Sequence, residues 1–139
     1  MAEGVELIRR FYDEVLGGGN VDLVDELSTD EMIDHEEGIP GQPSGKEGVK
    51  FFVTTMREAF PDIKAEIGPS LEAGDLASAE VTLTGTQKGE FMGASPSDKS
   101  FEVESIDIVR IEDGRCAEHW GVTDVMSLMQ QIGAVPAAA

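Results

Sequence analysis

The sequence predicts an α+β fold, in which N-terminal helices lie against one face of a curved, mostly antiparallel sheet. Apolar residues recur at three- and four-residue steps up to Phe60, which is the period of an amphipathic helix. From Ile63 onward they alternate with polar residues, which is the period of a half-buried strand. A chain of 139 residues suits one domain, which we place at residues 1–139, with a core at about 4–133 and a frayed tail at 134–139.

Four helices are expected, at residues 5–16, 21–27, 46–60 and 126–132. The three glycines at 17–19 end the first helix, and Asn20 is placed to cap the second. Ser44 and Glu47 have the spacing of a capping box for the third helix, which Pro61 should end. Three helices therefore precede the sheet.

The strands are expected at residues 63–67, 77–83, 101–111 and 115–123, with a further short segment at 32–35. Residues 85–97 are rich in turn-forming types and are expected to form a lip. Glu112-Asp113-Gly114 should join the last two strands as a hairpin.

The register of that hairpin decides which side chains meet. A two-residue turn would place Asp107 opposite Trp120, whereas a three-residue turn with a bulge at Gly114 would place Asp107 opposite His119. We favour the bulged turn, because the other face of the strand then keeps two isoleucines together for burial. The inner face is expected to carry four residues, Ser105, Asp107, His119 and Gly121. A carboxylate and an imidazole facing each other across a strand pair can hydrogen-bond.

The chain is strongly acidic, with 28 Asp and Glu residues against 10 Lys and Arg and a net charge of −18. Such a charge repels nucleic acids and anionic membrane surfaces, so neither is expected as a partner. The acidic residues are spread along the chain, which is typical of a solvated surface. Adaptation to a high-salt environment is the alternative, since counterions would screen the repulsion.

A cytoplasmic location is expected. No apolar run approaches the length of a membrane span, and the N-terminus has no basic segment followed by an apolar one. A lone cysteine, Cys116, rules out an internal disulfide and fits a reducing compartment.

Ten short motifs together resemble one family, the SnoaL-like polyketide cyclases, also called predicted ester cyclases. The resemblance runs from about residue 4 to residue 133. The motifs are Phe11-Tyr12-Asp13-Glu14-Val15, Ile33-Asp34-His35, Pro40-Gly41, Gly45-Lys46-Glu47-Gly48, Ala59-Phe60-Pro61-Asp62, Leu83-Thr84-Gly85-Thr86, Gly89-Glu90-Phe91, Ile106-Asp107-Ile108, Arg110-Ile111-Glu112-Asp113-Gly114 and Glu118-His119-Trp120.

The resemblance implies a cone-shaped fold shared with nuclear transport factor two, in which a strongly curved sheet encloses an apolar pocket. It implies a homodimer formed across the outer sheet face, and a small hydrophobic ligand such as a carbonyl or polyketide-like molecule. Cyclases of this family close a ring by intramolecular aldol condensation without metal or cofactor. An aspartate removes the acidic proton, and polar neighbours hold the enolate.

The sequence departs from the family pattern at its centre. The position of the acid/base aspartate is Gly121, and the polar pair of the preceding strand falls on Ser105 and Asp107. A relocated pair is the hypothesis for catalysis, with Asp107 orienting His119 as the base. A merely structural polar pair on the sheet is the alternative.

Other residues complete the candidate site. His35 is taken as a third catalytic candidate, and Asp34 beside it as a pocket residue, with a surface position for His35 as the alternative. Tyr12 is expected to pack in the core with its hydroxyl reaching the pocket. Trp120 should lie on the opposite face from His119. Because no His-x-His or Glu-x-x-His spacing occurs, no metal site is expected.

Two classes of function remain open. One is a cofactor-free lyase, isomerase or cyclase that abstracts a proton from a small carbonyl compound. The other is a noncatalytic homodimer that binds a small molecule, which the glycine at position 121 favours. Whether the protein is an enzyme is not decided by its residue types.

Overall fold

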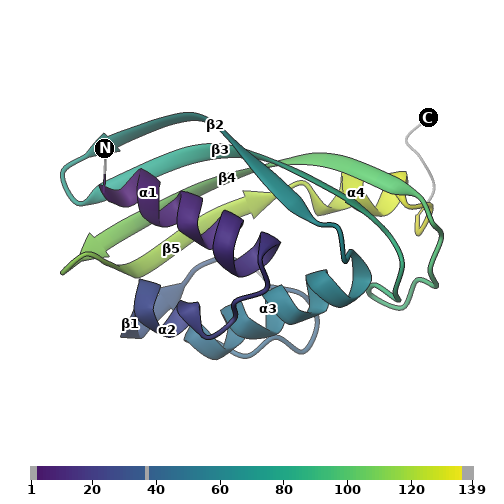
Figure 1. Ribbon diagram of the computed structural model, residues 1–139, viewed down its shortest axis with the longest axis horizontal. Coiled ribbons are helices and arrows are strands. Elements are labelled where there is room, and N and C mark those ends of the chain that lie inside the picture. Colours follow the sequence, from purple (N-terminus) through teal and green to yellow (C-terminus); the bar gives the residue numbers. More distant parts are fainter. Residues whose placement is uncertain (1–2, 37, 136–139) are drawn as a thin grey trace.

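Helices and a five-stranded sheet form two layers, as Figure 1 shows. The computed structural model describes residues 3–36 and 38–135. The strand order is β1-β5-β4-β3-β2, and all pairs are antiparallel except β1 with β5. The α+β fold with a curved, mostly antiparallel sheet is therefore confirmed.

The elements follow one another along the chain much as expected. The helical elements are α1 (Glu3–Arg10), the π-helical η1 (Phe11–Gly17), α2 (Leu23–Leu27), α3 (Gly45–Ala59) and α4 (Val125–Gln131). The strands are β1 (Ser28–Asp34), β2 (Lys64–Ala73), β3 (Leu76–Thr86), β4 (Ser100–Glu112) and β5 (Arg115–Thr123). The first expected helix is thus an α-helix that continues as a wider π-helix, a form often found at functional sites.

The core lies between the helices and the inner face of the sheet. Alternate residues of β3 and β4 are buried, as the period of a half-buried strand requires. Phe60, at the end of α3, packs its ring against Phe91 and Phe101 at centroid distances of 5.1 and 4.8 Å. Phe91 belongs to the expected lip, which is therefore anchored in the core.

The hairpin between β4 and β5 differs from both expected registers. Asp113 and Gly114 both have positive φ, which gives a two-residue turn that pairs Glu112 with Arg115. The ladder then shifts by one residue between Cys116 and Glu118, so that Ala117 is the extra residue of a bulge. The bulged turn was therefore the wrong choice, because the bulge lies within the strand.

Two local expectations were also wrong. Ser44 precedes α3 but makes no side-chain capping bond, and α2 begins after Asp22 instead of at a cap formed by Asn20. Asp124, by contrast, caps α4 by accepting a hydrogen bond from the backbone N–H of Ser127. Of the expected frayed tail, residues 136–139 lie outside the described part of the chain.

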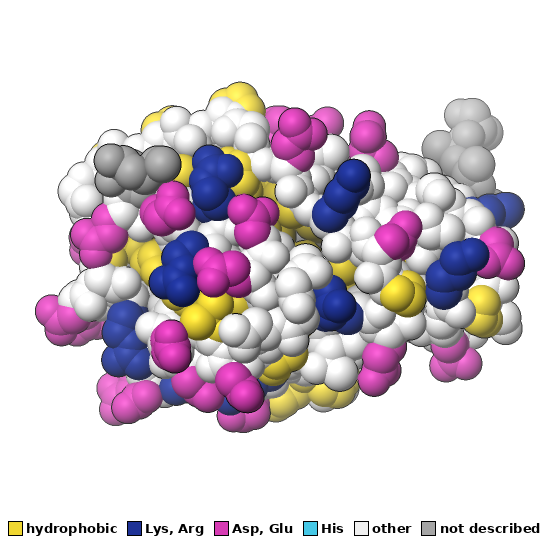
Figure 2. Space-filling model, in the orientation of Figure 1, with side chains coloured by type: hydrophobic (Ala, Val, Ile, Leu, Met, Phe, Trp, Pro, Cys, Tyr) yellow, Lys and Arg dark blue, Asp and Glu magenta, His cyan; other side chains and the backbone are white. Residues whose placement is uncertain are grey.

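Acidic side chains are scattered over the helical face, with lysines and arginines between them (Figure 2). Several of these charges form surface ion pairs, such as Lys50 with Asp25 at 2.9 Å. Exposed pairs of this kind contribute little to stability. No helix among the residues described is long and apolar enough to cross a membrane.

Candidate active site

A cavity of about 630 Å³ lies between the helices and the inner face of the sheet. Apolar side chains from the helical layer and the sheet form most of its wall, among them Leu7, Ile8, Phe11, Val24, Leu27, Met32, Val49, Phe52, Leu83 and Val109. Met92, which is 45% exposed in the lip, also lines it. A concave apolar site with a few polar groups is typical of small-molecule pockets.

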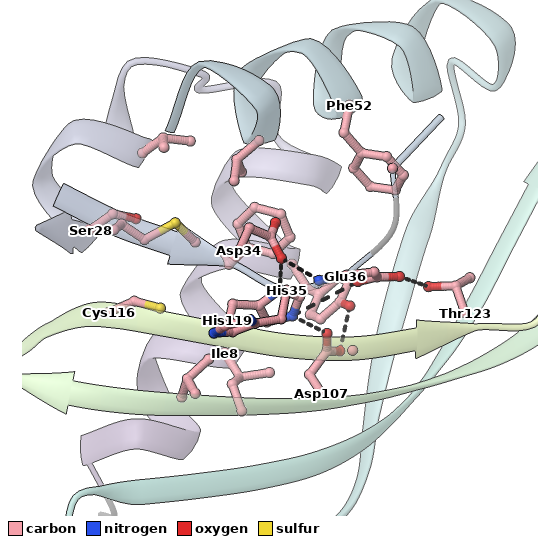
Figure 3. Close-up of a pocket in the computed structure, with 18 of the residues that line it drawn as sticks. Ile8, Ser28, Asp34, His35, Glu36, Phe52, Asp107, Cys116, His119 and Thr123 are labelled. Carbon is pink, nitrogen blue, oxygen red and sulfur yellow. Dashed lines mark hydrogen bonds and ion pairs between the residues drawn. The ribbon is translucent and has the colours of Figure 1, made fainter. Parts of the chain in front are cut away.

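The polar groups of the cavity centre on His119 (Figure 3). Its Nε2 lies 2.7 Å from Oδ1 of Asp107, and its Nδ1 lies 2.8 Å from Oδ1 of Asp34. Asp107 is opposite Gly121 in the ladder, so His119 reaches it on the diagonal. Asp34 stands beside His119 because β1 pairs in parallel with β5 at these two residues. The sequence-predicted pair is therefore present, although in another register.

The two carboxylates decide the charge of His119. Burial alone would lower the pKa of this imidazole, but the hydrogen bonds to Asp107 and Asp34 and the charges of both carboxylates raise it to about 10. Both ring nitrogens are therefore protonated at neutral pH, and each donates to a carboxylate. The interpretation of His119 as the base is not supported, because an imidazolium has no lone pair to accept a proton.

Tyr12 fixes the other oxygen of Asp107. This tyrosine is 7% exposed in η1, and its hydroxyl donates to Asp107 Oδ2 at 2.6 Å. Burial, together with the nearby charge of Asp107, raises the pKa of Tyr12 well above its ordinary value. The hydroxyl is therefore a donor, and it reaches the cavity as expected.

Glu36, which sequence reasoning did not single out, is the third carboxyl group of the cavity. It follows β1, and its backbone N–H donates to Asp34 Oδ1 at 3.0 Å. Thr123 donates to its Oε2 at 3.1 Å. Ser105, which is 1% exposed, lies 3.1 Å from Thr123 Oγ1 and is not among the described residues that line the cavity. Nothing in the run Asp34-His35-Glu36-Glu37 distinguishes Glu36 from an ordinary surface acid, which is why the pattern did not reveal it.

His35 borders the cavity, but its ring makes its contacts elsewhere. The imidazole stacks on Trp120 at a centroid distance of 4.9 Å, and its Nε2 lies 2.7 Å from Glu118 Oε2. Glu118 and Trp120 flank His119 on β5, so they point to the opposite face of the sheet. These contacts match the surface alternative for His35, and its catalytic role stays a prediction.

Gly121 leaves a space beside the catalytic candidates. A Cβ atom built on it would lie 2.6 Å from Glu36 Oε1 and 2.9 Å from Asp107 Oδ1. The Glu36 carboxylate therefore fills the room that a side chain at position 121 would need.

Glu36, Asp107 and His119 also offer ligand atoms within 4.8 Å of one another. A metal ion there would have to displace the proton that His119 shares with Asp107. The carboxylate and imidazole set fits acid/base chemistry without that step, and the expectation of a site free of metal and cofactor stays a prediction.

Fold and site together define a small α+β protein with an apolar cavity whose floor holds charged acid/base groups. Residues 6–132 match the family model described as SnoaL-like polyketide cyclase. The chain belongs to the SnoaL-like polyketide cyclase family, and the resemblance seen in its motifs is confirmed.

Several known proteins are similar over most of their length. Aklanonic acid methyl ester cyclase DauD from Streptomyces sp. (strain C5) is 28% identical over 96% of this chain and 83% of its own. Nogalonic acid methyl ester cyclase from Streptomyces nogalater is 26% identical over 83% of this chain and 87% of its own. Among solved structures, TsrD from Streptomyces laurentii shares 28% identity with a TM-score of 0.83, covering 96% of each chain.

Proposed function

We propose that this protein catalyses a cofactor-free, intramolecular aldol ring closure of a small polyketide-like carbonyl compound. The observation that carries the proposal is the hydrogen-bonded chain from Tyr12 through Asp107 and His119 to Asp34 at the floor of an apolar cavity. A noncatalytic pocket has no need of a chain of four hydrogen-bonded ionisable groups, two of which, Tyr12 and Asp107, are buried.

The chemistry follows from these groups. A carboxylate removes a proton next to a substrate carbonyl, and the resulting enolate carbon attacks a second carbonyl in the same molecule. The alkoxide then takes up a proton, so that substrate and product are isomers. The fixed positive charge of His119 stabilises the enolate oxygen inside the largely apolar cavity.

The substrate is expected to be neutral. Three carboxyl groups, those of Asp34, Glu36 and Asp107, surround the single imidazolium of the site, which disfavours an anion. The relatives DauD and nogalonic acid methyl ester cyclase have names that specify methyl esters, in which a carboxyl charge is masked.

The test is to incubate the protein with the methyl esters of aklanonic and nogalonic acid and to separate substrate from product by chromatography. We expect a product of unchanged mass that forms faster than in buffer. The free acids should be turned over at least about tenfold less efficiently in kcat/KM, which corresponds to about 1.4 kcal/mol of repulsion. An equal rate with and without protein for every compound would reject ring closure of this class.

A noncatalytic binding protein is the second candidate, and the glycine at position 121 favours it. In that case calorimetry should show that the esters bind, while chromatography should show no product. Binding with product formation would exclude it.

We also propose that the protein is a homodimer and acts in the cytoplasm. The outer sheet face carries exposed apolar side chains, including Ile106 and Val122 at 54% and 76% exposure, which a second copy of this chain would cover. A single, buried Cys116 thiol supports a reducing compartment.

A further inference from the structure

We propose that Glu36, supplied by the segment after β1, is the general base that removes the substrate proton. This assignment rests on the proposed ring closure. It is carried by the hydrogen bonds of the cavity carboxylates and by the space at Gly121.

Among the described residues, hydrogen bonds leave two cavity carboxylate oxygens without a donor, Asp34 Oδ2 and Glu36 Oε1. The Asp34 carboxylate is paired directly with the imidazolium at 2.8 Å, whereas Glu36 Oε1 lies 4.0 Å from it. Asp107 accepts from His119 through Oδ1 and from Tyr12 through Oδ2. Asp34 Oδ1 accepts from both the imidazole and the backbone N–H of Glu36. Glu36 Oε2 accepts from Thr123, whereas no hydrogen bond between described residues reaches Glu36 Oε1. This oxygen therefore keeps its lone pairs for a substrate.

Glu36 Oε1 also has the required position. It lines the cavity at 4.0 Å from His119 Nε2, close enough to the cation for charge stabilisation but too far for a hydrogen bond. The side chain is 24% exposed, so a ligand in the cavity can touch it. Because residue 121 has no side chain, this oxygen can lie 2.6 Å from the position that a Cβ atom on residue 121 would take.

The surroundings adjust the basicity of Glu36 in a favourable direction. Burial raises the pKa of its carboxyl group; the His119 charge and the Thr123 hydrogen bond oppose this effect, and the charges of Asp107 and Asp34 add to it. Tyr12 on η1 is the remaining ionisable group close by. A carboxylate with a raised pKa is a stronger base than an ordinary glutamate.

The proton balance of the step is simple. Glu36 Oε1 takes the proton from the carbon next to the carbonyl, and the C–H electron pair becomes the enolate. The enolate carbon forms the new C–C bond at the second carbonyl. Protonated Glu36 then returns its proton to the alkoxide, and no oxidant or reductant is needed.

The experiment uses the two methyl esters and five proteins. These are the wild type, Glu36→Gln, Glu36→Ala, Glu36→Ala combined with Gly121→Asp, and Glu104→Gln, which makes the same amide substitution at an exposed residue of β4. For each protein, kcat, KM and the pH profile are measured, and circular dichroism checks the fold.

Glu36→Gln should lower kcat on the order of 10²–10⁴-fold, the usual contribution of a general base, with little change in KM. The wild type should lose activity at acidic pH as Glu36 becomes protonated, and this loss should be absent from Glu36→Gln. Gly121→Asp should restore part of the activity to Glu36→Ala, because the side chain of residue 121 would start 2.6 Å from the position of Glu36 Oε1. Glu104→Gln should behave as the wild type.

Two results would overturn the assignment, and they are distinct. An active wild type together with a folded Glu36→Gln variant of wild-type kcat would remove Glu36 as the base and leave ring closure in place. A wild type that accelerates neither ester would overturn ring closure and the base assignment together.

Discussion

Asp107 and His119 are joined by a 2.7 Å hydrogen bond although they are not opposite each other in the sheet: Gly121 is the ladder partner of Asp107. The diagonal contact brings the imidazole between Asp107 and Asp34, which lie on the two strands that flank β5. His119 is thereby charged, and the charge links three strands at the floor of the cavity.

Removing one carboxylate should lower the pKa of His119, so that the imidazole loses its charge nearer to neutral pH. Asp107→Asn replaces an anionic acceptor of His119 by a neutral amide, so the pKa of His119 should fall by more than about one unit from its value of about 10. NMR titration of the two histidines would measure this. The His35 signals provide an internal reference, because that ring contacts Glu118 and Trp120 instead. A wild-type His119 that titrates near 6.5 would contradict the charge assignment.

Folding stability should decline in alkaline solution. The pKa of His119 is raised from 6.5 to about 10 on folding, so its stabilising effect is complete below pH 6.5 and is lost as the pH rises to about 10. The slope should approach about 1.4 kcal/mol per pH unit, the limit for one proton. Urea unfolding between pH 6 and 10 measures it, and His119→Gln is the control that should flatten the curve.

The hydroxyl of Tyr12 should contribute measurably to stability. Tyr12→Phe keeps the ring that packs edge-on against Phe11 and leaves Asp107 Oδ2 without its donor. We expect a loss of about 1–3 kcal/mol in the free energy of unfolding, as for a buried charged acceptor left unpaired. In a double-mutant cycle with Asp107→Asn the two losses should not add. Additive losses would show that the bond contributes nothing.

A side chain at position 121 should conflict with Glu36. Gly121→Asp brings a fourth carboxyl group into contact with Glu36 and Asp107, and we expect destabilisation of about 1–3 kcal/mol. The loss should be smaller when Glu36 is replaced by Ala, since the space is then free. Equal losses in both backgrounds would mean that Glu36 does not occupy this space.

A charge on the outer sheet face should produce monomers. Val122→Lys places an ammonium group on the exposed apolar face on which the proposed dimer rests. Light scattering should then give the mass of one 14.9 kDa chain, whereas the wild type should give twice that mass. Val125→Lys, at the less exposed start of α4, is a comparison variant. A monomeric wild type at micromolar concentration would reject the dimer.

The sequence was sufficient to predict the fold, because its apolar residues follow a clear helical period and a clear strand period in separate parts of the chain. The sequence also predicted that Asp107 and His119 lie on one face of the sheet, although the predicted hairpin register was wrong. The expected and observed registers differ by two residues, and side chains alternate with a period of two, so the faces stayed correct.

The rest of the site depends on tertiary geometry that local patterns do not contain. The parallel pairing of β1 with β5 joins Asp34 to His119 across 85 positions of the chain. Glu36 lies beyond the end of a strand, where no periodicity indicates its direction. The charge of His119 likewise follows only once two carboxylates are known to bracket it.

The space beside Gly121 also bears on how proteins of this kind should be compared. A column-by-column alignment would score position 121 as having lost its functional group and would class the chain as a degenerate relative. In three dimensions a carboxylate oxygen lies 2.6 Å from the missing Cβ, contributed from a point 85 residues earlier in the chain. Relatives with glycine at this position are better sorted by asking whether any acidic side chain reaches the same point in space.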